Sequence, residues 1–341
     1  MKSVRRICAV LCGIVLLVAG LLKLMDPLGA SLVVGEYYNY LHLGFLAPSS
    51  KVVALAMALL EAITGAALIT GVRPRLTALV SGVLLGAFTI LTLVLWIDNP
   101  KMDCGCFGEA LHLTHFQSFI KNVVLCVLWA LAFLPLRRVW TPFKVKTVSF
   151  SIAVISIIAF MVYSLLNIPA MDFTPFKPGA TLMQAQDSPS PDSPLLSICD
   201  ANGDYFDELL ADGHKLLLTA YDPDELSDKD QEKLLSYADS LADLRGLQTM
   251  FIAAGGFPGA AGAYTADRRS LMTVNRSNGG ATLLSDGMVI AKWHLRSLPD
   301  QAKLASLCEQ DGASAVAKEN TPRRLKLQGF LLYLFAVILL L

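Results

Sequence analysis

Six long apolar blocks constrain the fold of this chain more than any other feature. Of its 341 residues, 54% are hydrophobic and only 16% are charged, a composition too apolar for an ordinary soluble protein. Most of the blocks have a length within the roughly 17–25 residues that a helix needs to cross a bilayer. They cover residues 7–22, 52–72, 76–97, 119–136, 148–168 and 327–341. The sequence therefore predicts a multi-pass membrane protein of about six transmembrane helices.

The balance of acidic and basic residues indicates which kinds of partner the chain is expected to bind. The formal net charge is zero, so no general attraction to nucleic acid is expected, and the lipid bilayer is the first partner that the composition implies. A basic start at Lys2, Arg5 and Arg6 precedes the first block, so a signal peptide is the alternative to a membrane helix there. Residues 23–27 do not resemble a cleavage site, which favours the helix.

Basic residues in the short loops predict the orientation of the helices, because such residues are retained on the cytoplasmic side. They form three clusters, which lie before the first block, between the second and third, and between the fourth and fifth. The clusters are Lys2, Arg5 and Arg6, then Arg73 and Arg75, then Arg137, Arg138, Lys144 and Lys146. The loops at 26–51 and 98–118 are then expected to face outward, together with the large region 169–325. Arg323, Arg324 and Lys326 depart from the rule, since they precede the last block on the outer side.

Three polar residues lie in or near the apolar blocks: Lys23 at the end of the first, Glu61 in the middle of the second and Asn122 near the start of the fourth. An ionised carboxylate in hydrocarbon is costly, so Glu61 must be paired, protonated or near water. One interpretation is a structural ion pair with Lys23 that fixes helix packing. The other is a proton or ligand site.

Cys104 and Cys106 stand in the segment Asp103-Cys104-Gly105-Cys106-Phe107-Gly108, in an outward loop. Two cysteines separated by one glycine close a small, strained ring, and strained disulfides are the exchanging kind. Thiol–disulfide exchange is the leading interpretation, and a static or unreactive pair is the alternative. A metal site with His112 and His115 is a third, although the spacing is not a standard zinc pattern.

A family resemblance rests on these elements in order: residues 19–27 with Lys23, Glu61 with its glycines, the Cys104–Gly108 segment, and residues 119–122. Together they resemble the DoxX-like membrane proteins, and in particular the MauE branch named for methylamine utilisation, over about residues 1–140. The resemblance implies a four-helix bundle in the bacterial inner membrane. It also implies an accessory role in maturing disulfide-rich extracytoplasmic proteins, as in methylamine metabolism.

The region 195–312 alternates strand and helix patterns: strands at 216–221 and 249–254 flank a helix at 231–244, and a hairpin at 281–293 turns at residues 285–287. This order resembles a thioredoxin-like fold. The redox motif is missing, because residues 222–225 read Asp-Pro-Asp-Glu where a CxxC would stand, and no proline precedes the hairpin. The domain is therefore expected to be degenerate. Cys199 and Cys308 either form a disulfide or remain two separate thiols.

The sequence thus predicts a membrane α-helical bundle joined to an α/β thioredoxin-like domain. Its expected parts are the membrane domain 1–140, a fifth helix in 141–170, a Pro/Ser-rich linker 171–194, the extracytoplasmic domain 195–312 and a C-terminal helix 325–341. We expect a thiol–disulfide accessory factor with an extracytoplasmic thiol or disulfide protein as partner. A quinone acceptor is compatible with the bundle, but no quinone motif can be read. The alternatives are a non-enzymatic assembly scaffold, or a small-molecule or metal transporter that uses Lys23, Glu61 and Asn122.

Overall fold

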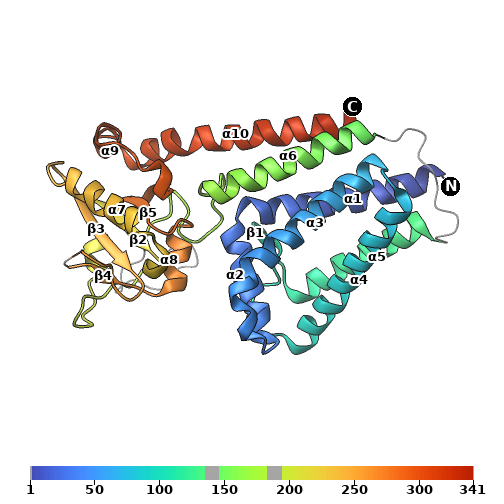
Figure 1. Ribbon diagram of the computed structural model, residues 1–341, viewed down its shortest axis with the longest axis horizontal. Coiled ribbons are helices and arrows are strands. Elements are labelled where there is room, and N and C mark those ends of the chain that lie inside the picture. Colours follow the sequence, from blue (N-terminus) through green and yellow to red (C-terminus); the bar gives the residue numbers. More distant parts are fainter. Residues whose placement is uncertain (1, 135–145, 183–193, 261, 341) are drawn as a thin grey trace. The chain divides into compact units, whose positions relative to one another are not determined.

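The computed structural model describes residues 2–134, 146–182, 194–260 and 262–340. It divides into two compact units, one made of residues 1–164 with 328–341 and the other of residues 165–327 (Figure 1). Each unit is considered by itself. The predicted basic residues 137, 138 and 144 and residues 183–193 of the predicted linker lie outside the described residues.

The first unit is helical. Its helices are α1 Lys2–Met25, α2 Pro27–Tyr40, α3 Ser50–Thr70, α4 Pro74–Asp98, α5 His115–Phe133 and α6 Thr147–Leu166, with a 3-10 helix η1 at Gly44–Ser49. Within the described residues, five segments are long and apolar enough to cross a membrane: Ser3–Met25, Gly44–Thr70, Pro74–Asp98, His115–Phe133 and Thr147–Leu166. The first five predicted spans are therefore confirmed as helices, with bounds that differ by a few residues.

The predicted sixth span is not supported in the same way. Residues 327–340 fall in α10, Gly312–Leu340, which begins well before the predicted start at 325, and residue 341 lies outside the described residues. In the described chain, α10 is not among the helices that meet the length and hydropathy required of a span. Charged residues such as Lys318, Glu319 and Arg324 occupy its first part.

Small residues let α1 and α3 lie in close contact. A Cβ atom added at Gly20 would stand 2.5 Å from the backbone nitrogen of Ala62, and one at Gly65 would stand 2.6 Å from the carbonyl oxygen of Gly13. Larger side chains at these glycines would therefore push the two helices apart. This close approach places the end of α1, which carries Lys23, against the middle of α3.

Helix α2 was not expected from the sequence. Asp26 caps its start, because the carboxylate Oδ1 accepts a hydrogen bond from the Gly29 backbone N–H at 2.9 Å, and Pro27 occupies the first turn. Asp26 is thus a helix cap. Farther along the chain, the short strand β1, Cys106–Glu109, packs against α1 and α2. A capping box between Thr114 and Gln117 then starts α5.

The second unit holds a five-stranded mixed sheet of order β4-β3-β2-β5-β6. Its strands are β2 His214–Ala220, β3 Leu247–Ala253, β4 Tyr264–Thr265, β5 Gly280–Ser285 and β6 Met288–Trp293. Strands β2, β3 and β4 run parallel, whereas β5 and β6 are antiparallel to their neighbours. The predicted strands, hairpin and first helix, α7 Asp228–Ser240, are confirmed; β4 and the short helix α8, Arg268–Val274, were not predicted.

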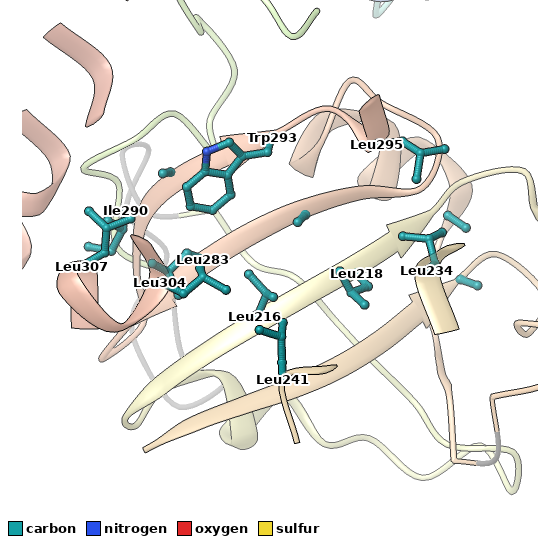
Figure 2. Close-up of a cluster of buried hydrophobic side chains, with 14 of the residues drawn as sticks. Leu216, Leu218, Leu234, Leu241, Leu283, Ile290, Trp293, Leu295, Leu304 and Leu307 are labelled. Carbon is teal, nitrogen blue, oxygen red and sulfur yellow. The ribbon is translucent and has the colours of Figure 1, made fainter. Parts of the chain in front are cut away.

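Both faces of the sheet are covered by apolar side chains, because successive residues of a strand point to opposite faces. Leu216 and Leu218 of β2 join one core with Leu234 of α7 and Leu304 of α9, Gln301–Cys308 (Figure 2). Leu217 joins the other core, on the opposite face. Strand β2 is therefore buried on both sides, as its continuous apolar run predicts.

Candidate functional site

A buried ion pair links α1 and α3. Lys23 Nζ lies 2.5 Å from Glu61 Oε1, and only 1% of the Glu61 side chain is exposed. Lys23 also stands over the ring of Phe88 on α4, 5.4 Å from its centroid. The ion pair expected between these two residues is formed, and the carboxylate at mid-helix has its counter-charge.

The two cysteines of the Cys104–Gly108 segment face each other. Their Sγ atoms are 3.1 Å apart, and both residues are free thiols in this structure. The backbone is held in place by the Tyr37 hydroxyl of α2, which donates a 2.7 Å hydrogen bond to the Cys104 carbonyl oxygen. Gly105 has a φ of +61°, and a Cβ there would overlap the Val33 side chain, so glycine is required between the cysteines.

Helix α5 contributes Lys121 and Asn122. The Asn122 side-chain amide donates to Thr92 Oγ1 and to the Phe88 carbonyl oxygen, each at 3.1 Å, and thereby ties α5 to α4. Lys121 Nζ lies 4.8 Å from the centroid of the ring of Phe107, the residue that follows Cys106 in the chain. Lys121 therefore adds a second ammonium group to this end of the helices.

The electrostatic environment makes the two thiols unequal. The hydrogen bond between them lowers the pKa of Cys106 to about 5 and raises the pKa of Cys104 above its ordinary value. Burial opposes the shift at Cys106, and the ammonium groups of Lys121 and Lys23 favour its thiolate. Cys104 is buried, whereas Cys106 is partly accessible. Cys106 is thus the more readily ionised thiol of the pair, with Cys104 as the hydrogen-bond donor.

One cavity of about 160 Å³ brings these groups together. It lies among α1 to α5 and the cysteine loop, and most of its wall is aliphatic or aromatic. Its polar lining residues, all in the first unit, are Lys23, Tyr37, Glu61, Thr92, Cys104, Cys106, Lys121 and Asn122. The structure therefore gathers in one place the cysteine pair and the three polar residues that the sequence analysis treated as separate features.

The third interpretation, a metal site with the nearby histidines, finds no ligand set in the part of the chain that the structure describes. No group of three or more His, Cys, Asp or Glu residues there is arranged to hold an ion. His112 lies 3.6 Å from Asp103, and the His115 ring nitrogen Nε2 lies 3.0 Å from the Pro100 carbonyl oxygen. These contacts are local to the loop.

The two cysteines of the second unit are not joined. Cys199 and Cys308 are free thiols, so the disulfide alternative is not realised and they are two separate groups. Cys199 Sγ lies 2.9 Å from Thr265 Oγ1, beside the edge strand β4. Cys308 ends α9 and packs against the core that Figure 2 shows. The two thiols belong to different parts of the domain.

At the end of β2, where a thioredoxin-like fold would carry its CxxC motif, Asp222 and Asn278 make the local contacts. The Asp222 N–H donates to Asn278 Oδ1 at 3.1 Å, and Asn278 Nδ2 donates back to the Asp222 carbonyl oxygen at 2.6 Å. Arg268 forms a 2.5 Å ion pair with the Asp222 carboxylate. These groups contain no thiol, and the two cysteines that face each other, Cys104 and Cys106, lie in the first unit.

Five apolar helices and a thiol pair beside a buried ion pair define a multi-pass membrane protein with a polar centre that carries two cysteines. Residues 1–136 match the family model described as methylamine utilisation protein MauE, which confirms the resemblance over this region. The match contains the whole site described above. Comparisons with curated proteins and with solved structures gave no match.

Sequence reasoning missed Tyr37 and Lys121 as members of the site. Tyr37 lies on the unexpected helix α2, and its role depends on a contact 67 residues away in the chain. In the sequence prediction Lys121 is only part of the segment 119–122, although a lysine just inside an apolar block is itself a signal of a functional group.

Proposed function

We propose that this chain is an inner-membrane accessory factor that exchanges disulfides with extracytoplasmic proteins, with Cys104 and Cys106 as its redox element. The observation that carries the proposal is the 3.1 Å contact between the two Sγ atoms in a cavity that also holds Lys23 and Lys121. The likeness of residues 1–136 to MauE supports a place in methylamine utilisation or a related maturation process.

The chemistry is an exchange through a mixed disulfide. The Cys106 thiolate attacks one sulfur of a partner disulfide, and a partner thiolate leaves. The Cys104 thiol then gives its proton to the partner thiolate released first and attacks Cys106, which releases the second partner thiolate and closes the Cys104–Cys106 bond. In reverse, a partner dithiol opens that bond and leaves with the disulfide. The forward direction reduces the partner, and the reverse direction oxidises it.

The α/β domain is proposed to recognise the partner without taking part in the chemistry. Three parallel strands followed by an antiparallel hairpin, with α7 between β2 and β3, support a degenerate thioredoxin-like arrangement. Asp222 and Asn278 stand where the cysteine motif and the proline would be, which agrees with a binding role. The basic loops support an extracytoplasmic position for residues 169–325.

Trapping of mixed disulfides tests this function. Cys104→Ser leaves the Cys106 thiolate without its resolving thiol, so adducts with a partner protein should accumulate on a non-reducing gel. Cys106→Ser should trap far fewer adducts, because the remaining thiol, that of Cys104, is buried. Cys199→Ser and Cys308→Ser are matched controls in the same chain and should trap none.

Two outcomes would contradict the proposal. Adducts that form only with the Cys199 or Cys308 variants would place the exchange in the α/β domain. The absence of adducts from every variant, with folded protein in the membrane, would favour the scaffold alternative, in which the cysteine pair is a fixed element of the loop.

A further inference from the structure

The cavity beside the cysteines is lined mostly by apolar side chains, and thiol exchange with a protein partner gives these side chains no role. Aliphatic and aromatic side chains of α1, α3 and α4 form its sides: Val15, Leu16, Met57, Leu85, Phe88 and Leu91. The two thiols and the Lys23–Glu61 pair line the same cavity as these apolar side chains. Such a mixture of many apolar and few convergent polar groups is typical of a small-molecule site.

We propose that this cavity binds the ring of a membrane-soluble quinone, which takes two electrons from the Cys104–Cys106 dithiol and so regenerates the disulfide. The inference rests on the proposed function, because it supplies the oxidant that would make the exchange run in the direction of partner oxidation. It adds a second substrate, of stated chemical class, to the same site.

The size of the cavity favours a single six-membered ring. A protein cavity of about 150 Å³ accepts benzene, and the volume here is about 160 Å³. The apolar side chains exclude a strongly hydrated oxidant, and a disulfide protein is too large to enter. A quinone ring combines an apolar body with two carbonyl oxygens, which matches the wall.

The polar groups supply partners for those carbonyl oxygens. Lys23 and Lys121 each carry an ammonium with three N–H donors, of which Lys23 directs one to Glu61 at 2.5 Å. The other donors of these two residues, at the border of the cavity, match the oxygens of a ring inside it. Charge-assisted hydrogen bonds of this kind stabilise the negative charge that grows on a quinone oxygen during reduction.

The electrons and protons of the step balance. One S–S bond forms between Cys104 and Cys106, and the two electrons released pass to the ring, whose two C=O groups become C–OH. One proton comes from the Cys104 thiol. Since Cys106 is already a thiolate, the second proton comes from the Lys23 ammonium, which is reprotonated from solvent. Disulfide and quinol are the products, and no other co-reactant is needed.

The test uses the full-length protein in detergent, reduced and freed of reductant under anaerobic conditions, with decylubiquinone as the probe. We expect one quinol to form for each dithiol lost. The loss of quinone absorbance measures the quinol, and mass analysis of the alkylated cysteines measures the remaining dithiol. Leu91→Trp, which fills the cavity from α4, should slow the reaction at least about tenfold. Leu93→Trp is the matched control, because Leu93 lies on the same helix outside the cavity lining, and it should leave the rate unchanged.

A binding measurement separates this inference from the proposed function. Decylubiquinone should raise the unfolding temperature of the Cys106→Ser protein, which cannot transfer electrons, and Leu91→Trp should abolish that rise. If partner adducts form in the trapping experiment but the quinone is neither reduced nor stabilising, the quinone inference is wrong and the exchange function stands. If Leu91→Trp and Leu93→Trp behave alike in well-folded protein, the ring does not occupy this cavity.

Discussion

Replacing Glu61 by glutamine tests the buried ion pair at the centre of the site. The substitution keeps the size of the side chain and removes its charge, in a position where 1% of the residue is exposed. The Lys23 ammonium then loses the negative charge that it contacts at 2.5 Å, although the glutamine amide oxygen can still accept a hydrogen bond from it. The Phe88 ring, 5.4 Å from Lys23 Nζ, remains as a contact that partly compensates the positive charge.

The expected cost follows from that geometry. Removing one partner of a buried ion pair destabilises a protein by about 3–5 kcal/mol. We expect the lower end, about 3 kcal/mol, because Lys23 keeps 15% of its side chain exposed and a cation–π contact contributes about 0.5–2 kcal/mol. Adding Lys23→Met to Glu61→Gln removes the uncompensated charge, so the double variant should recover about half of the loss.

The assay is a double-mutant cycle on the full chain in detergent, with the free energy of unfolding measured for the four proteins. Lys101→Met, at an exposed position, is the control for the lysine-to-methionine change and should stay within about 0.5 kcal/mol of the parent. A coupling energy below about 0.5 kcal/mol between Glu61 and Lys23 would show independent residues and refute the reasoning.

Three further predictions concern the cysteine loop. Because the pKa of Cys106 is lowered to about 5, its alkylation rate by iodoacetamide should be nearly constant between pH 8 and 6 and fall by half near pH 5; a loss of about tenfold per pH unit from pH 8 downward, as for an ordinary thiol, would contradict the lowered pKa. Gly105→Ala should slow exchange and lower the free energy of unfolding by about 1–2 kcal/mol or more, since the φ of Gly105 is +61°. Adding Val33→Ala should remove the overlap with the new Cβ but not the backbone strain, so unfolding measurements should show only a partial recovery. Cys106 should react with a membrane-impermeant maleimide from outside intact cells after mild reduction, whereas labelling only after permeabilisation of the inner membrane would reverse the topology.

The sequence predicts the local elements of both units because each has a strong periodic or compositional signal. The apolar blocks become helices α1, α3, α4, α5 and α6, and the turn at residues 285–287 joins β5 to β6. The Lys23–Glu61 pair could also be predicted, because a buried carboxylate needs a partner and few basic residues are available within the apolar blocks.

The assembled site could not be predicted in the same way. Helix α2 lacks a long apolar run, and only the Asp26 cap followed by Pro27 signals its start. Bringing the cysteine loop to Lys23 and Lys121 depends on packing between segments far apart in the chain, which residue spacing does not encode. The sixth span stays a prediction, since α10 is not among the described helices that meet the length and hydropathy required of a span.

The central claim is that Cys104 and Cys106 cycle between dithiol and disulfide. The most direct measurement is a redox titration of the purified full-length protein in a graded glutathione series, with the loop peptide read by differential alkylation and mass spectrometry. We predict one reversible two-electron transition confined to these two cysteines, with Cys199 and Cys308 remaining alkylatable throughout. A pair that stays fully reduced or fully oxidised across the series would contradict the account.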